Sequence, residues 1–256
     1  MEDQLRTLVA FALGLLLILL RLDAERFGAA EYDEARDGRP PSRLGRLAWY
    51  VLGFGIIALA MVAYPGSAGE IGLSLGSDRV AAISLGFILG AMGIAQAMAF
   101  AYLRYGRLRL PDPASYPGAI ANGLATAFID EAAFRGLFLG FLLMAGLEPR
   151  AAIVVQALVY TLATRTGAAG RPPYMFVLSL GIGFLGGWAT VVTGGIGAAF
   201  LGHAITRISV FLATGHAGSV APTGREVEDV LRRRLIPEGW RVIGPRDGRG
   251  STAHER

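Results

Sequence analysis

The sequence predicts an all-α fold, a polytopic membrane helix bundle of about seven transmembrane helices. Its 256 residues are 53% hydrophobic and only 17% charged, which leaves too little polar surface for a soluble domain of this size. Long runs contain no charged residue, among them Leu47–Gly69 and Val80–Leu103. Each of these runs can cross a hydrocarbon core of about 30 Å as a helix.

The runs are continuous rather than alternating, which favours membrane helices over barrel strands. The expected spans are residues 5–22, 47–65, 80–103, 117–146, 150–164, 173–193 and 195–214. The first apolar run is flanked by Arg6 and Arg21 and lacks a small-residue cleavage motif. We therefore expect it to stay as a membrane helix whose arginines snorkel outward.

Arginine supplies all 24 basic residues, and its distribution predicts the orientation of the bundle. With seven spans, the loops on one side of the membrane hold three arginines and those on the other side hold nineteen. Cytoplasmic loops carry the excess of positive charge in membrane proteins. The N-terminus is thus expected outside and the C-terminus in the cytoplasm, in the plasma membrane.

Three parts follow along the chain. Residues 1–46 are an N-terminal membrane helix and a charged cytoplasmic loop, residues 47–214 are the membrane bundle, and residues 215–256 are a cytoplasmic tail. Residues 225–236 of the tail have apolar side chains at helical spacing, next to three consecutive arginines. This short amphipathic helix either lies along the anionic leaflet or caps the bundle. The net charge of +4 is small, so the expected partner is the lipid bilayer and not nucleic acid.

Away from the ends of the predicted spans, five Asp, Glu, Arg or His side chains lie in the hydrocarbon region, where charges are costly and usually functional. They are Asp130, Glu131, Arg135, His203 and Arg207. Glu131 and Arg135 are four residues apart and can form an ion pair on one helix face. Asp130 points about 100° away from Glu131. His203 and Arg207 share one face of the last span.

Three motifs resemble the CAAX prenyl protease and bacteriocin-processing (CPBP) family of intramembrane proteases. The stretch "DEAAFRG" resembles that family's EExxxRG motif, and "YTLAT", with Tyr160 and Thr164, falls where the family has FxxxH. The stretch "TGGIGAAFLGHAITRI" resembles a TGS-like turn followed by HxxxN. The resemblance covers roughly residues 117–214, which form a CPBP-like core.

The resemblance implies an intramembrane endopeptidase that cleaves membrane-associated peptides or prenylated C-terminal tails. In the family the leading glutamate activates a water molecule, and the histidines and asparagine orient this water and stabilise the oxyanion. A carboxylate can act as the base in this reaction, and neutral hydrogen-bond donors can stabilise the oxyanion. Carried over, Asp130 or Glu131 is the base, and His203 orients the water or stabilises the oxyanion. Arg135 holds Glu131.

The chain departs from the family pattern at Asp130, Thr164 and Arg207, which replace a glutamate, a histidine and an asparagine. We hypothesise that Arg207 neutralises Asp130, which would turn a reactive site into a structural ion-pair cluster. The alternative is that Arg207 snorkels to the cytoplasmic end of its helix. Two other functional classes stay open: a non-catalytic pseudoprotease that binds a partner or prenylated tail, and a small-solute transporter.

No cofactor and no metal are expected. The chain contains no cysteine, which removes thiolate ligands and nucleophiles. His203 is the single histidine inside a predicted span, and this argues against bound zinc.

Overall fold

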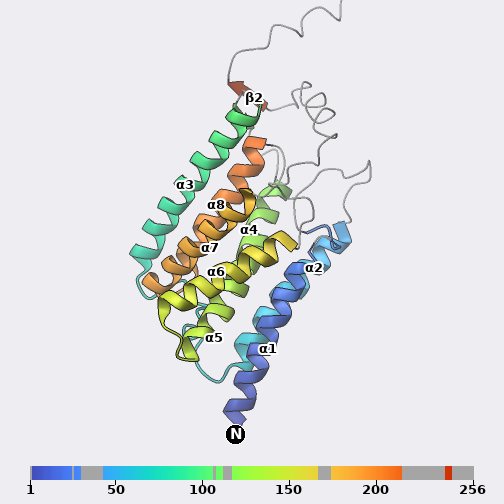
Figure 1. Ribbon diagram of the computed structural model, residues 1–256. Coiled ribbons are helices and arrows are strands. Elements are labelled where there is room, and N and C mark those ends of the chain that lie inside the picture. The colour runs from blue at the N-terminus through green and yellow to red at the C-terminus, as the bar shows by residue number, and fades with distance from the viewer. Residues whose placement is uncertain are drawn as a thin grey trace, which may run out of the picture.

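The computed structural model describes residues 2–24, 26–29, 43–105, 108–111, 117–166, 174–214 and 240–243. They form a bundle of helices (Figure 1), which confirms the predicted all-α class. The elements are α1 (Glu2–Leu22), α2 (Arg43–Ala63), α3 (Arg79–Tyr105), β1 (Leu108–Pro111), α4 (Pro117–Glu131), the π-helix η2 (Ala132–Phe138), α5 (Leu139–Met144), α6 (Pro149–Thr166), α7 (Tyr174–Thr193), α8 (Gly197–Thr214) and β2 (Trp240–Ile243).

The outside of the bundle is apolar, as a lipid-facing surface must be. Helices α1, α2, α3 and α7 are long and apolar enough to cross a membrane, and α6 and α8 are apolar but shorter. Large hydrophobic side chains project outward from several of these helices, for example Leu8, Val62, Val80 and Val177. Since a soluble monomer rarely exposes apolar patches of this extent, the chain is a multi-pass membrane protein. The orientation of its termini stays a prediction.

The predicted span 117–146 is one continuous rod made of α4, η2 and α5. The backbone is right-handed helical at both junctions, Glu131 and Leu139. Between Thr126 and Phe141 all side chains are buried except two that are half-buried, so the rod is the central helix of the bundle. The π-helical turn was not predicted, and such turns are frequent at functional sites.

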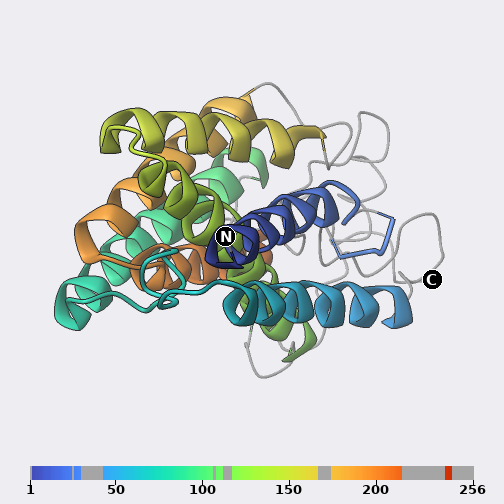
Figure 2. The same cartoon turned by 90° about the horizontal axis from the view of Figure 1, so that it is seen from below.

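The other helices surround this rod (Figures 1 and 2). Helix α8 packs along α3 and also against α4, α7 pairs with α6, and α1 pairs with α2 and reaches η2. Glycine allows the close approach of α3 and α8: a Cβ atom added at Gly93 would lie 1.9 Å from Thr206 Oγ1. Such small-residue contacts are typical of membrane helix pairs.

The connection between α2 and α3, residues 64–78, packs under η2 and under the α7–α8 turn. Its Ile71 is fully buried, and a Cβ atom at Gly140 would meet the Ile71 backbone at 2.8 Å. Ser74 O accepts a hydrogen bond of 2.9 Å from Ile196 N. This connection therefore covers one end of the central rod.

Strands β1 and β2 form a two-stranded antiparallel ribbon with Leu108 opposite Ile243. The ribbon joins part of the tail to the segment after α3 and was not predicted. The amphipathic helix expected at 225–236 lies outside the described residues, as does most of the charged loop before α2. The proposed division at residues 46 and 214 stays a prediction.

Candidate active site

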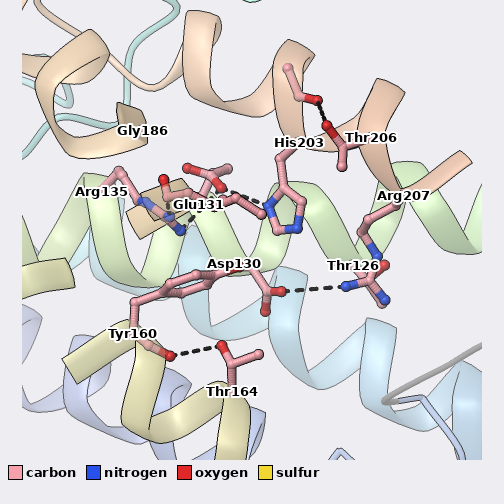
Figure 3. Close-up of polar contacts among 12 residues, drawn as sticks. Thr126, Asp130, Glu131, Arg135, Tyr160, Thr164, Gly186, His203, Thr206 and Arg207 are labelled. Atoms are coloured by element: carbon pink, nitrogen blue, oxygen red, sulfur yellow. Dashed lines mark hydrogen bonds and ion pairs between the residues drawn. The ribbon is translucent and has the colours of Figure 1, made fainter. Parts of the chain in front are cut away.

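Glu131, the last residue of α4, lies at the centre of a buried polar cluster (Figure 3). Its Oε1 atom is 2.7 Å from His203 Nδ1 and 3.1 Å from Arg135 Nη1. The ion pair with Arg135 is the one predicted from the i, i+4 spacing. Glu131 Oε2 has no hydrogen-bond partner among the described residues. One carboxylate oxygen is therefore held by two cationic or donor groups, while the other is available for a ligand.

Arg135 is fully buried and is fixed on several sides. Its Nη2 donates to Ile182 O of α7 at 3.3 Å, and its guanidinium carbon lies 3.9 Å from the centre of the Tyr160 ring. A Cβ atom at Gly186 would lie 3.1 Å from Arg135 Nε, so glycine at this position of α7 leaves room for the side chain. These contacts orient the arginine toward Glu131.

Asp130 points to a different side of the rod, as predicted, but its closest partner was not predicted. Arg21 Nε of α1 lies 2.7 Å from Asp130 Oδ1, and the two side chains are 3% and 1% exposed. The expectation that Arg21 snorkels outward is therefore wrong. Since a buried carboxylate requires a compensating charge, Arg21 is drawn inward to Asp130.

Arg207 of α8 also approaches Asp130, with Nη1 3.8 Å from Oδ2 (Figure 3). Its side chain is 15% exposed, so it lies between the two alternatives drawn from the sequence. The contact is longer than that of Arg21, which is therefore the main counter-ion of Asp130. With Arg21 included, the described cluster holds three arginines and two carboxylates.

The second motif contributes packing, and the hydroxyl of its Thr164 is engaged within its own helix. Thr164 is buried, and its hydroxyl donates to Tyr160 O of the same helix at 2.7 Å. The Tyr160 ring packs edge-on against Phe134 and His203, with centroids 5.2 and 6.4 Å apart. The Tyr160 ring thus packs against both the Arg135 and the His203 side chains.

A cavity of about 80 Å³ lies between α3, α7 and α8 and reaches Glu131 and His203. A few water molecules fit in this volume, since each occupies about 30 Å³ in the liquid. Of the residues singled out from the sequence, these two line the cavity, whereas Asp130, Thr164 and Arg207 do not. The other lining residues are Leu89, Met92, Gly93, Gln96, Ile182, Leu185, Gly186, Ala199, Gly202 and Thr206. The two adjacent carboxylates are therefore in different surroundings.

A second polar stripe runs along α4 toward Asp130. Asn122 and Thr126 precede Asp130 by eight and four residues, and both are buried. Tyr50 of α2 donates its hydroxyl hydrogen to Asn122 Oδ1, and the Thr126 hydroxyl donates to Asn122 O. This stripe faces α2 and α8, away from the cavity side of the rod. Within the described residues, no three His, Asp or Glu side chains gather as a metal site would require.

Sequence reasoning missed Arg21 and Gln96. Arg21 ends an apolar run, where an arginine ordinarily snorkels, and the sequence already offered Arg207 as a partner for Asp130. Gln96 did carry a signal, because it is the one amide side chain in the apolar run 80–103. Because the Gln96 side chain is not ionisable, it was not among the five residues singled out from the predicted spans.

The fold and this cluster define a multi-pass membrane protein with a carboxylate–arginine–histidine centre on a cavity. Residues 112–209 match the family model described as "Type II CAAX prenyl endopeptidase Rce1-like". The match covers less than half of the chain and confirms the resemblance drawn from the three motifs. The search of curated proteins and the search of solved structures found no match.

Proposed function

We propose that the protein is an intramembrane endopeptidase in which Glu131 and His203 together activate water. The observation that carries the proposal is the placement of both residues on one cavity, with Glu131 Oε1 bonded to His203 Nδ1 at 2.7 Å. A carboxylate that accepts from one ring nitrogen of histidine leaves the other as a proton acceptor. The pair has the composition of a general base.

In the proposed reaction, a cavity water gives one proton to His203 Nε2 while its oxygen attacks the scissile carbonyl carbon. Glu131 holds the ring in the tautomer with Nδ1 protonated and stabilises the imidazolium that forms. His203 then returns the proton to the departing amine nitrogen as the C–N bond breaks. Arg135 holds the Glu131 carboxylate in place through their ion pair, and so acts as a positioning residue.

The proposed substrates are peptides anchored in the bilayer, including prenylated C-terminal tails. The family-model match over residues 112–209 supports this class, and the cavity is lined mostly by apolar and glycine residues.

The purified chain in lipid vesicles tests the proposal against a panel of membrane-anchored peptides, one of them farnesylated near its C-terminus. New N-termini are identified by mass spectrometry. We expect cleavage by the natural chain and none by Glu131→Gln. Absence of cleavage across the panel would reject the endopeptidase proposal.

A second candidate function is non-catalytic binding of such tails. Two arginines face Asp130 and the Thr164 hydroxyl bonds within its own helix, and both features favour a structural cluster. Saturable binding of the farnesylated peptide without cleavage would support this candidate. Cleavage that depends on Glu131 would exclude it.

We further propose that the N-terminus is outside the plasma membrane and the C-terminus in the cytoplasm, on the basis of the arginine distribution. Because the chain has no cysteine, single cysteines report the topology without background. Gly69→Cys, in an exposed part of the α2–α3 connection, should react with an impermeant maleimide in intact spheroplasts. Arg43→Cys, at the start of α2, should react only after permeabilisation. The reverse pattern would contradict the orientation.

A further inference from the structure

Gln96 of α3 has no role in the chemistry described so far. It is half-buried inside a helix that is otherwise apolar in this region, and it lines the same cavity as Glu131 and His203. No hydrogen bond joins its amide to another described residue. A side-chain amide without a partner in apolar surroundings costs free energy unless water or a ligand satisfies it.

The cavity needs a donor that neither member of the proposed base can supply. His203 Nδ1 is engaged with Glu131, and its Nε2 must accept the proton of the water. Stabilisation of the negative charge that develops on a carbonyl oxygen requires a separate donor already in place. Besides Glu131 and His203, the described polar side chains that line the cavity are Gln96 and Thr206.

Thr206 is not suited to this task, because its hydroxyl donates to Gly202 O at 2.7 Å. Arg207 does not line the cavity and approaches Asp130 on another side of the rod. The Gln96 amide presents two N–H donors, does not carry a charge and sits on α3, whereas Glu131 lies on α4 and His203 on α8. A peptide carbonyl in the cavity can thus contact the Glu131–His203 base, which α4 and α8 supply, and a hydrogen-bond donor from α3.

We propose that the side-chain amide of Gln96 donates a hydrogen bond to the carbonyl oxygen of the scissile peptide bond as it becomes an oxyanion. This role rests on the proposed endopeptidase function and assigns a further catalytic residue to it. The residue lies outside the segment 112–209 that matches the family model. The donor is thus supplied by a helix that the motifs do not include.

Two substitutions of similar length test the proposal. Gln96→Met removes both donor and acceptor, and Gln96→Glu keeps the acceptor oxygens but loses the N–H donors when ionised. Loss of an oxyanion donor lowers kcat by about 100- to 1,000-fold, and we expect this for both variants. Because the contact forms mainly in the transition state, KM should stay within about threefold. Ser84→Ala, which removes a polar group from the exposed face of the same helix, should leave both constants unchanged.

A binding measurement separates this role from the proposed function, because it needs no turnover. A membrane-anchored peptide whose scissile carbonyl is replaced by a tetrahedral hydroxymethylene group is compared with its parent peptide, both on the Glu131→Gln protein. Adding Gln96→Met should weaken binding of the analogue by about tenfold or more, the loss expected for one hydrogen-bond donor. The affinity for the parent peptide should stay unchanged.

Two results would overturn the assignment of Gln96. One is a kcat that stays within a few-fold of the natural chain in both variants. The other is an analogue affinity that does not depend on residue 96. If the natural chain cleaves nothing but the analogue still binds through Gln96, the endopeptidase proposal fails and the Gln96 contact stands.

Discussion

Replacing Arg21 by alanine is expected to destabilise the bundle by about 3–5 kcal/mol, the range for breaking a buried ion pair from one side. The substitution leaves the Asp130 carboxylate in a site that is 1% exposed. Its remaining partner would be Arg207 Nη1, 3.8 Å from Oδ2. Thermal unfolding in detergent, monitored by helical circular dichroism, measures the loss.

A double-mutant cycle attributes this loss to the pair. Asp130→Asn removes the charge that Arg21 compensates, so the double variant should be more stable than the sum of the single variants predicts. We expect a coupling of about 2 kcal/mol or more, at the upper end of values for contacting residues. Arg6→Ala is the matched control, since Arg6 is an exposed arginine on the same helix and its loss should cost under about 1 kcal/mol. Additive single effects would contradict the buried pair.

The membrane fold was predictable from the sequence because its physical cause is local. Twenty or so apolar residues must form a helix in the bilayer whatever their neighbours are, so six of the seven expected rods needed only the run length. The seventh, 117–146, was predictable in extent but not in detail. Its π-turn from Ala132 to Phe138 depends on how Arg135 and Gly136 pack against neighbouring helices, and no periodicity in the sequence shows that.

Part of the site was predictable for the same reason. Glu131 and Arg135 belong to one helix, and their spacing fixes the ion pair. The contact between Glu131 and His203 joins two helices, and the motif resemblance indicated the two residues without their geometry. The partner of Asp130 was not predictable, because it depends on the rotation of α1 against the rod, and the sequence of α1 carries no motif for it.

Helix α1 bears on the role of Asp130 in the proposed reaction. By the motif resemblance, Asp130 falls where the family has its leading glutamate, yet α1 supplies it with a guanidinium at 2.7 Å. This buried contact engages Oδ1 of Asp130 with a side chain of another helix. Glu131 is also paired with an arginine, but it shares its charged oxygen with a histidine on the cavity. We therefore propose a structural role for Asp130 and the chemical role for the Glu131–His203 pair.

This division of roles predicts different outcomes for a change at Glu131 and a change at the Asp130–Arg21 pair. Glu131→Gln should lower kcat/KM by about 10²–10⁴-fold, the contribution of a general-base unit, because a neutral amide cannot stabilise the imidazolium of His203. Asp130→Asn combined with Arg21→Gln removes the second carboxylate and its counter-ion together. The combined variant should stay within about tenfold of the natural chain, since small shifts of a nearby helix alter positioning only in part.

The comparison is decisive because the two carboxylates are neighbours and both carboxylate-to-amide substitutions keep the side-chain volume. Thermal unfolding of each variant serves as the control, so that a loss of activity is compared at equal folded fraction. Cleavage that survives Glu131→Gln but vanishes in the Asp130→Asn/Arg21→Gln variant would return the catalytic role to Asp130. In that case Arg21 would act on the catalytic base and would not be only a structural counter-ion. The cavity that reaches Glu131 would then not be the place where the peptide bond is cleaved.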